Sequence, residues 1–288
     1  MPGTLCDHSW IGASYGIPTL NSVLKLTILI CYGSAASLLA ISRGKRATGS
    51  HSTALIGVMS GVLGLLMHTY LLYAASLGEV GLQLSFGNTI SLVGSLIALV
   101  ALIGSARTEF TGLAALLLPF AALSALTTGL GEGRSIAHLG WPMQAHIVLS
   151  VVAYSLLTIA ALLAGLIAIQ DKRLRTRHPF GLLRLLPPLE SMEGLLFTTI
   201  GAGFGLLSLA IFSGLIFVDN MFAQHLVHKT VLSLIAWLIF GVLLFGRTKF
   251  GWRGRKAIRW TLGGFAVLAL AYFGSRLVLE FVLNRHWG

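Results

Sequence analysis

The sequence predicts an all-α, polytopic integral membrane protein with eight transmembrane helices. Three observations carry this prediction: 56% of the 288 residues are hydrophobic, only 10% are charged, and the mean hydropathy is +0.86. A soluble globular chain has about 25% charged residues, because water must solvate its surface. The composition therefore excludes an ordinary soluble enzyme, a disordered chain and a disulfide-stapled secreted domain.

Eight apolar segments are candidates for crossing the hydrocarbon core, which takes about 20 residues of helix. None of them alternates with a period of two, so helices are expected rather than barrel strands. The fourth segment is the shortest, and Pro119 within it is expected to kink the helix. In chain order, the expected spans cover about residues 20–41, 53–77, 85–105, 110–127, 143–169, 194–217, 223–245 and 259–283.

Every second loop between these spans is rich in basic residues. Counting Arg259 at the edge of the last span, 15 of the 20 Lys and Arg residues follow spans one, three, five and seven. Loops rich in Lys and Arg stay on the cytoplasmic side. Both termini are therefore expected on the outer, periplasmic side of a bacterial inner membrane. The net charge of +11 then reflects topology, and nucleic acid is not expected as a partner.

The expected organisation is one transmembrane domain over residues 20–284, with a short outer segment before it (1–19) and an outer tail after it (285–288). The largest stretch between spans, about 170–193, is basic and interrupted by prolines. Leucines among its arginines predict a short interfacial helix that lies on anionic lipid.

Two pairs of glycines four residues apart lie inside expected spans, Gly57 with Gly61 and Gly201 with Gly205. Small residues at this spacing allow helices to approach closely. Packing within the chain is favoured over a dimer contact, and the oligomeric state is not predicted.

The histidines are distributed differently from the lysines and arginines. His68 lies inside the second span, about 22 Å along it from the cytoplasmic edge, and His146 opens the fifth span at its outer end. His225 and His228 open the seventh span, also at the outer end. Imidazole is costly inside a membrane without a partner, and it is the usual axial ligand of haem iron. Two interpretations stay open. Either these histidines bind haem in the outer half, or His68 forms a hydrogen bond with a neighbouring helix while the others are interface residues in contact with water.

Two cations share the outer half with these histidines. Lys229 directly follows His228, and Arg276 lies four residues before Glu280 in the last span. Each is suited to meet the propionates of haem. Arg276 is equally suited to pair with Glu280, and Lys229 to extend toward the lipid headgroups. No nucleophile–base constellation and no Glu-x-x-His motif occurs, so an enzyme is not expected.

Several local motifs match those of one known family. Residues 145–155, Ala-His-Ile-Val-Leu-Ser-Val-Val-Ala-Tyr-Ser, are similar to the histidine-bearing helix start of the cytochrome c assembly family of membrane haem-handling proteins. Residues 229–237 are similar to the helix that follows the family's tryptophan-rich outer segment. Residues 251–255 and 271–276 resemble the C-terminal signature of its small eight-span YpjD/HemX-like branch.

The resemblance implies an eight-helix fold with a haem-related function in a bacterial inner membrane. It matches His146 and His68 to histidines of the family, at the outer end of the helix and inside the second span. Residues 219–228 hold none of the tryptophans of the haem-presenting members, which leaves haem binding, transfer or sensing as implied roles. The expected cofactor is haem b, bound in haem trafficking or cytochrome c biogenesis. The expected partners are haem, the lipid bilayer and another membrane protein of haem or cytochrome biogenesis.

One alternative from a different class stays open. A non-enzymatic scaffold or regulatory protein would dock a partner through the basic cytoplasmic loops, about 170–193 and 246–257. A solute transporter is disfavoured, because the sequence shows no repeated half with paired Gly- or Pro-broken helices.

Overall fold

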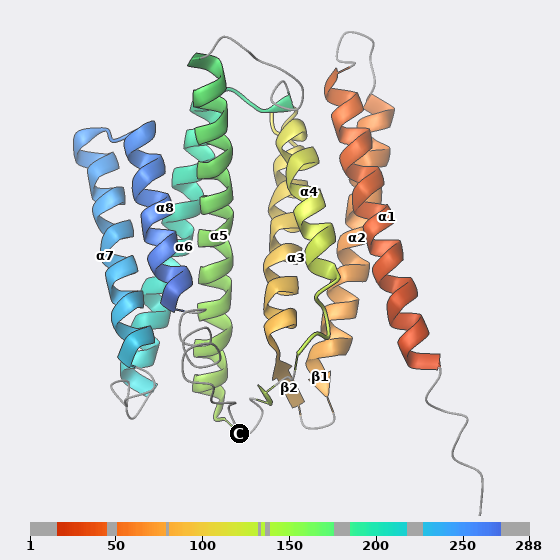
Figure 1. Cartoon of the computed structure of the whole chain (residues 1–288), viewed down its shortest axis with the longest axis horizontal. Coiled ribbons are helices and arrows are strands. Elements are labelled where there is room, and N and C mark those ends of the chain that lie inside the picture. Colours follow the sequence, from red (N-terminus) through yellow and green to blue (C-terminus); the bar gives the residue numbers. More distant parts are fainter. Residues whose placement is uncertain are drawn as a thin grey trace, which may run out of the picture.

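A computed structural model of the chain describes residues 16–44, 51–78, 81–131, 134–135, 139–175, 185–217 and 227–271. Within these ranges, consecutive helices run in opposite directions, and a small antiparallel sheet of order β1-β2-β3 lies at one end (Figure 1). The helices are α1 (Gly16–Gly44), α2 (His51–Ser76), α3 (Phe86–Ser105), α4 (Thr111–Ala125), α5 (Trp141–Arg175), α6 (Leu189–Phe217), α7 (Val227–Phe250) and α8 (Arg255–Ala269). The strands are β1 (Leu77–Gly78), β2 (Gly81–Leu84) and β3 (Arg134–Ser135).

Six of the described helices are long and apolar enough to cross a membrane: α1, α2, α3, α5, α6 and α7. The predicted helical membrane architecture is thereby confirmed, with three short strands that the sequence did not predict. The described parts of α4 and α8 have 15 residues each, fewer than a straight crossing needs. The eight predicted crossings are therefore not all found among the described residues. The last predicted span, 259–283, extends past the described range, and α4 continues through Pro119.

Helix boundaries depart by five or six residues from the predicted spans at the end of α5, the start of α6 and the end of α7. α5 continues to Arg175 and α6 begins at Leu189, so both extend beyond the apolar stretches that marked them. Lys, Arg and Glu are good helix formers, so α5 continues through Lys172 and Arg173, and α6 begins with a turn that contains Glu190. Residues 176–184, where the interfacial helix is expected, lie outside the described residues.

The helices form two groups of four that follow the chain (Figure 1). In the N-terminal group, α1 packs against α2 and α4, and α3 packs against the same two helices. In the C-terminal group, α5 packs against α6 and α8, and so does α7. Contacts between α3 and α5 join the two groups. Each group is therefore a closed ring of four helices, and one continuous apolar core runs through both groups.

The two ends of the bundle differ in charge. The basic end carries Arg43, Arg175, Arg247 and Arg255, at the ends of α1, α5 and α7 and the start of α8. The opposite end, called the sheet end, carries the three strands and the starts of α5 and α7 (Figure 1). The side of the membrane that each end faces stays a prediction from the loop charges.

Glycines allow the close packing of α2 predicted from their spacing. A Cβ atom at Gly57 would lie 3.1 Å from Cβ of Leu38 and 3.4 Å from the carbonyl oxygen of Ala35 on α1. A Cβ atom at Gly61 would lie 2.6 Å from Cδ2 of Leu102 on α3. By contrast, nothing lies within 4 Å of the Cβ position at Gly201 or at Gly205 among the described residues. The packing predicted for this second pair is therefore wrong in the described part of the chain, because its face of α6 points away from the other helices.

We expect Gly57→Leu to destabilise the protein, because the new side chain must push against α1. Overpacking of this kind costs about 1–3 kcal/mol. Gly201→Leu is the matched control, and it should leave stability unchanged or slightly raised, because leucine is the better helix former. Thermal unfolding in detergent, followed by tryptophan fluorescence, measures both variants. An equal loss of stability in the two would contradict the packing described here.

Candidate functional site

His68 lies on α2 in the half of the bundle nearer the sheet end, eight residues before the helix ends at Ser76. Its side chain is fully buried, with 0% exposed. Nδ1 lies 3.4 Å from the hydroxyl of Tyr32 on α1, and Nε2 lies 2.8 Å from the hydroxyl of Ser91 on α3. Both ring nitrogens therefore have a partner on another helix, as in the hydrogen-bonded interpretation of this residue.

The hydrogen bonds continue from His68 to the end of α4. Ser91 Oγ lies 2.6 Å from Thr128 Oγ1, and Thr128 Oγ1 donates to the carbonyl oxygen of Ala125 at 2.9 Å. When Thr128 donates to Ala125, Ser91 donates to Thr128 and His68 Nε2–H donates to Ser91. Tyr32 then donates to the lone pair of Nδ1. Tyr32, His68, Ser91 and Thr128 together are called the buried chain, and it joins all four helices of the N-terminal group.

Further hydrogen bonds close the sheet end around the buried chain. Lys25 Nζ on α1 donates to the carbonyl oxygen of Thr128 at 2.7 Å, past the C-terminus of α4 where a cation is favourable. Asn88 on α3 donates to Ser76 Oγ at 3.3 Å and accepts from Gly129 N at 2.9 Å. These contacts tie the ends of α2 and α4 to α3, so the surroundings of His68 are closed on the side of the sheet.

His146 lies on α5, five residues after the helix begins at Trp141, and is half-buried. Its Nδ1 lies 2.9 Å from Ser213 Oγ on α6, and Ser213 Oγ donates to the carbonyl oxygen of Ala210 at 2.9 Å. When Ser213 donates to Ala210, Nδ1–H of His146 donates to Ser213, and the carbonyl oxygen of Ala210 is a further acceptor beside the ring. In this tautomer the lone pair of the ring belongs to Nε2.

Two more polar contacts connect the helices of the C-terminal group. Tyr154 Oη on α5 lies 3.1 Å from Ser233 Oγ on α7. Trp237 Nε1 on α7 donates to Ser208 Oγ on α6 at 2.8 Å, and its ring stacks on Phe204 at 5.6 Å between centroids. Hydroxyl groups therefore hold α5 to α7 and α7 to α6 at positions where the chain is otherwise apolar.

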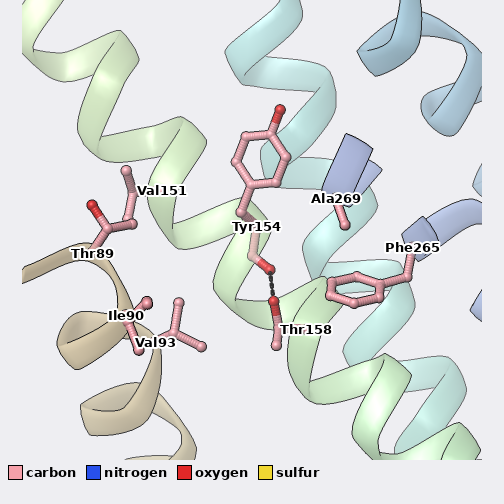
Figure 2. Close-up of a pocket in the computed structure, with 8 residues that line it drawn as sticks. All are labelled: Thr89, Ile90, Val93, Val151, Tyr154, Thr158, Phe265 and Ala269. Atoms are coloured by element: carbon pink, nitrogen blue, oxygen red, sulfur yellow. Dashed lines mark hydrogen bonds between the residues drawn. The ribbon is translucent and has the colours of Figure 1, made fainter. Parts of the chain in front are cut away.

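An apolar pocket lies where the two groups meet (Figure 2). It has an empty volume of about 490 Å³, including the part that is open to the surroundings. Val151 on its wall is five residues along α5 from His146, about 7.5 Å at 1.5 Å per residue. Its lining residues are Thr89, Ile90 and Val93 of α3, Val151, Tyr154 and Thr158 of α5, and Phe265 and Ala269 of α8.

The remaining predicted site residues are described only in part. Lys229 is exposed in the first turn of α7, at the sheet end, and His228 precedes it in the same helix. The side chain of His228, and the whole of His225 and Arg276, lie outside the described residues. In the described part of the chain, no three His, Cys, Asp or Glu side chains lie together as metal ligands would.

His68 and His146 have different hydrogen-bond partners, and no hydrogen bond joins them among the described residues. The partners of His68 all belong to the N-terminal group, whereas the partner of His146 is on α6 of the C-terminal group. Sequence reasoning missed Ser91, Thr128 and Ser213, which set the state of the two rings. Serine and threonine are frequent in these helices, and the sequence alone offers no signal for which of them reach a neighbouring helix.

Comparisons with known proteins agree on one family. A family model described as "Cytochrome C assembly protein" matches residues 56–283. The chain is 33% identical over 264 residues to "Inner membrane protein YpjD" of Escherichia coli (strain K12), which covers 90% of this chain and 99% of that relative. It is 27% identical over 164 residues to "Cytochrome c biogenesis protein CcsA" of Guillardia theta, covering 51% of this chain and 54% of that relative. It is 31% identical over 100 residues to "Cytochrome c biogenesis protein CcsA" of Microcystis aeruginosa, covering 34% of this chain and 30% of that relative. No solved structure matches the chain.

We expect Ser91→Ala to lower stability by about 1–3 kcal/mol, because it leaves the buried Nε2–H of His68 without an acceptor. Ser95→Ala is the matched control, since Ser95 lies one turn further along α3 and donates only to its own helix, to the carbonyl of Leu92. Denaturation of both variants in detergent measures the difference. Equal stability of the two variants would show that the buried chain contributes nothing.

Proposed function

The chain belongs to the cytochrome c assembly family, and from this premise we propose that it binds b-type haem in haem trafficking or cytochrome c biogenesis. The family description and the name of the CcsA relatives support the role in cytochrome assembly. The inner-membrane relative and the six apolar helices support a multi-pass position in a bacterial inner membrane. The observation that carries the proposal is the free lone pair of His146 at the sheet end of α5.

The residues around His146 would allow it to hold the iron of haem. Ser213 holds Nδ1–H, so the ring has a fixed orientation and Nε2 is the atom that faces a ligand. A hydrogen bond to the remote nitrogen is the usual support of a coordinating histidine. The neighbouring side chains Trp141 and Val148 are 77% and 46% exposed, so the start of α5 is not sealed by other described helices. A bound haem b supplies the iron that this imidazole coordinates.

His68 fits this role less well in the described arrangement. Its Nε2 carries a proton that Ser91 accepts, its Nδ1 accepts from Tyr32, and none of the side chain is exposed. To coordinate iron, the ring has to lose at least one of these partners. We therefore assign the first ligand to His146, and His68 becomes a second ligand only in a state in which the buried chain is broken.

The other residues of the predicted site take supporting roles in the proposal. Lys229, in the first turn of α7, offers a cation at the sheet end, where a propionate of haem gains from it. Arg276 is proposed for the same role, and His225 or His228 as a substitute ligand. The assignments of Arg276, His225 and His228 rest on the positions of these residues in the sequence.

We expect the purified protein, loaded with haem, to show a Soret band that His146→Ala removes and added imidazole partly restores. His68→Gln is expected to keep the band. Ser150→Ala is the control, since the Ser150 hydroxyl donates only to the carbonyl oxygen of His146 within α5. Loss of the band in His68→Gln alone would reverse the assignment of ligands. Failure of the wild-type protein to take up haem would overturn the proposed function.

We expect Ser213→Ala to weaken haem binding about tenfold without abolishing it, because such outer partners orient the ligand. Thr198→Ala on the same helix is the control, since Thr198 donates only to the carbonyl of Gly194. Titration with haem, followed by absorption, gives the two dissociation constants. Equal constants for the two variants would contradict the role of Ser213.

A further inference from the structure

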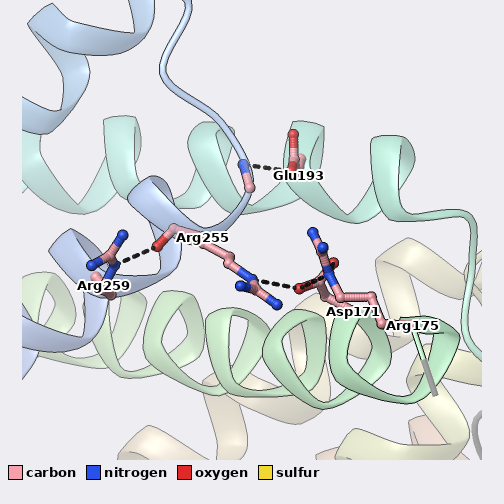
Figure 3. Close-up of polar contacts among 6 residues, drawn as sticks. Asp171, Arg175, Glu193, Arg255 and Arg259 are labelled. Atoms are coloured by element: carbon pink, nitrogen blue, oxygen red, sulfur yellow. Dashed lines mark hydrogen bonds and ion pairs between the residues drawn. The ribbon is translucent and has the colours of Figure 1, made fainter.

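The turn between α7 and α8 is held at the basic end by carboxylates of two other helices (Figure 3). Gly251 and Gly254 have φ angles of 62° and 58°, in the left-handed region that favours glycine. The N–H of Gly254 donates to Glu193 Oε1 of α6 at 2.8 Å. Arg255 Nε, at the start of α8, donates to Asp171 of α5 at 3.1 Å. The turn therefore has a defined position against α5 and α6.

Aromatic rings gather beside this turn. The Trp252 ring lies 5.4 Å from Trp260 and 6.4 Å from Phe250, between centroids. Phe250 is 69% exposed, and Phe245, one turn earlier on α7, is 56% exposed. Tryptophan and exposed aromatic rings concentrate at the boundary between hydrocarbon and headgroups. The turn is therefore expected at the depth of the lipid headgroups.

Four cations surround the same turn within seven residues, Arg253, Arg255, Lys256 and Arg259. The side chains of Arg253 and Arg255 are 65% and 62% exposed, and those of Lys256 and Arg259 are also exposed. Lys256 Nζ lies 3.7 Å from the centre of the Trp252 ring, so a cation and the aromatic cluster are in direct contact.

The carboxylates nearby use only part of this positive charge. Asp171 engages Nε of Arg255 and of Arg175, and Glu193 Oε2 lies 3.7 Å from Nε of Arg253. Each contact uses the inner nitrogen of a guanidinium group. The outer nitrogens of Arg253 and Arg255 have no hydrogen-bond partner among the described residues, so they are available to another anion.

We propose that the α7–α8 turn binds the headgroup of an anionic phospholipid. The outer nitrogens of Arg253 and Arg255, together with Lys256, hold the phosphate, since guanidinium groups form paired hydrogen bonds with its oxygens. The exposed rings of Phe250 and Phe245 lie along the first part of the acyl chains. A soluble anion satisfies the cations alone, whereas an anionic lipid satisfies the cations and the exposed rings together. This chemistry favours a lipid over an acidic protein or a free phosphate, and it is independent of haem.

The test measures lipid binding to the detergent-purified full chain by native mass spectrometry, with phosphatidylglycerol and phosphatidylcholine of equal chain length. We expect the anionic lipid to bind more tightly. Arg253→Gln/Lys256→Gln should weaken it about 25-fold, from about fivefold for each of the two charges near the surface. This variant keeps the Asp171–Arg255 pair, and its thermal unfolding is measured to show that it folds.

Lys172→Gln/Arg173→Gln is the matched control, because it removes two charges at the end of α5, on the same end of the bundle. We expect this control to weaken phosphatidylglycerol binding less than about threefold, because the proposed hydrogen bonds to the phosphate come from the turn and not from Lys172 or Arg173. Equal losses of phosphatidylglycerol affinity in the two double variants would overturn the proposal, because they would indicate only a general attraction of anionic lipid to the basic end. Equal binding of the two lipids would also overturn it. Displacement of the lipid by millimolar inorganic phosphate, or by an acidic peptide at equal concentration, would assign the turn to a soluble anion and overturn it as well.

Discussion

Hydrocarbon offers no partner to a polar group, and this constraint governs every polar side chain inside the bundle. Most hydroxyl groups meet it locally. Thr27, Ser155 and Thr158, for example, donate to the carbonyl four residues earlier on the same helix. Hydroxyls at helix contacts can also accept a hydrogen bond from a neighbouring helix, as Ser213 does from His146. At such contacts, the packing of the helices influences which ring nitrogen of a histidine carries the proton.

The same rule gives the two intramembrane histidines opposite states. In both places a hydroxyl can donate to a helix carbonyl, Thr128 to Ala125 and Ser213 to Ala210, and this arrangement defines the direction of the hydrogen bonds back to the histidine. The Ser91 hydroxyl stands between Thr128 and His68, so Nε2 of His68 carries the proton and Nδ1 faces Tyr32. For His146, the bond to Ser213 uses Nδ1 and leaves Nε2 open. The two histidines thus differ, in this arrangement, in whether a ring nitrogen keeps a lone pair that could bind a ligand.

Hydropathy predicted the helices well where apolar sequence and helix coincide, as for α3, expected over 85–105 and found over 86–105. It failed at the ends of α5 and α6, because a helix continues through charged residues that hydropathy counts as loop. Glycine spacing was a partial guide: the same interval marks packing at Gly57 and an open face at Gly201, because spacing does not say which way a face points. The sequence drew attention to His68 and His146, but Ser91 lies 23 residues and Ser213 lies 67 residues from its histidine. Contacts at such separations depend on the order of helices around the bundle, which hydropathy does not encode.

The difference between the histidines has an energetic consequence for the order in which haem would engage them. Coordination by His146 uses Nε2 and keeps the bond to Ser213, so the protein loses no hydrogen bond. Coordination by His68 breaks the bond to Ser91 or to Tyr32 and leaves a buried polar group unpaired, at a cost of about 1–3 kcal/mol for each group. If the His68 ring moves toward the C-terminal group, the buried chain that connects α1, α3 and α4 is also disturbed. Under the proposed function, haem would therefore engage His146 of the C-terminal group first, on a helix that packs against α3 of the N-terminal group.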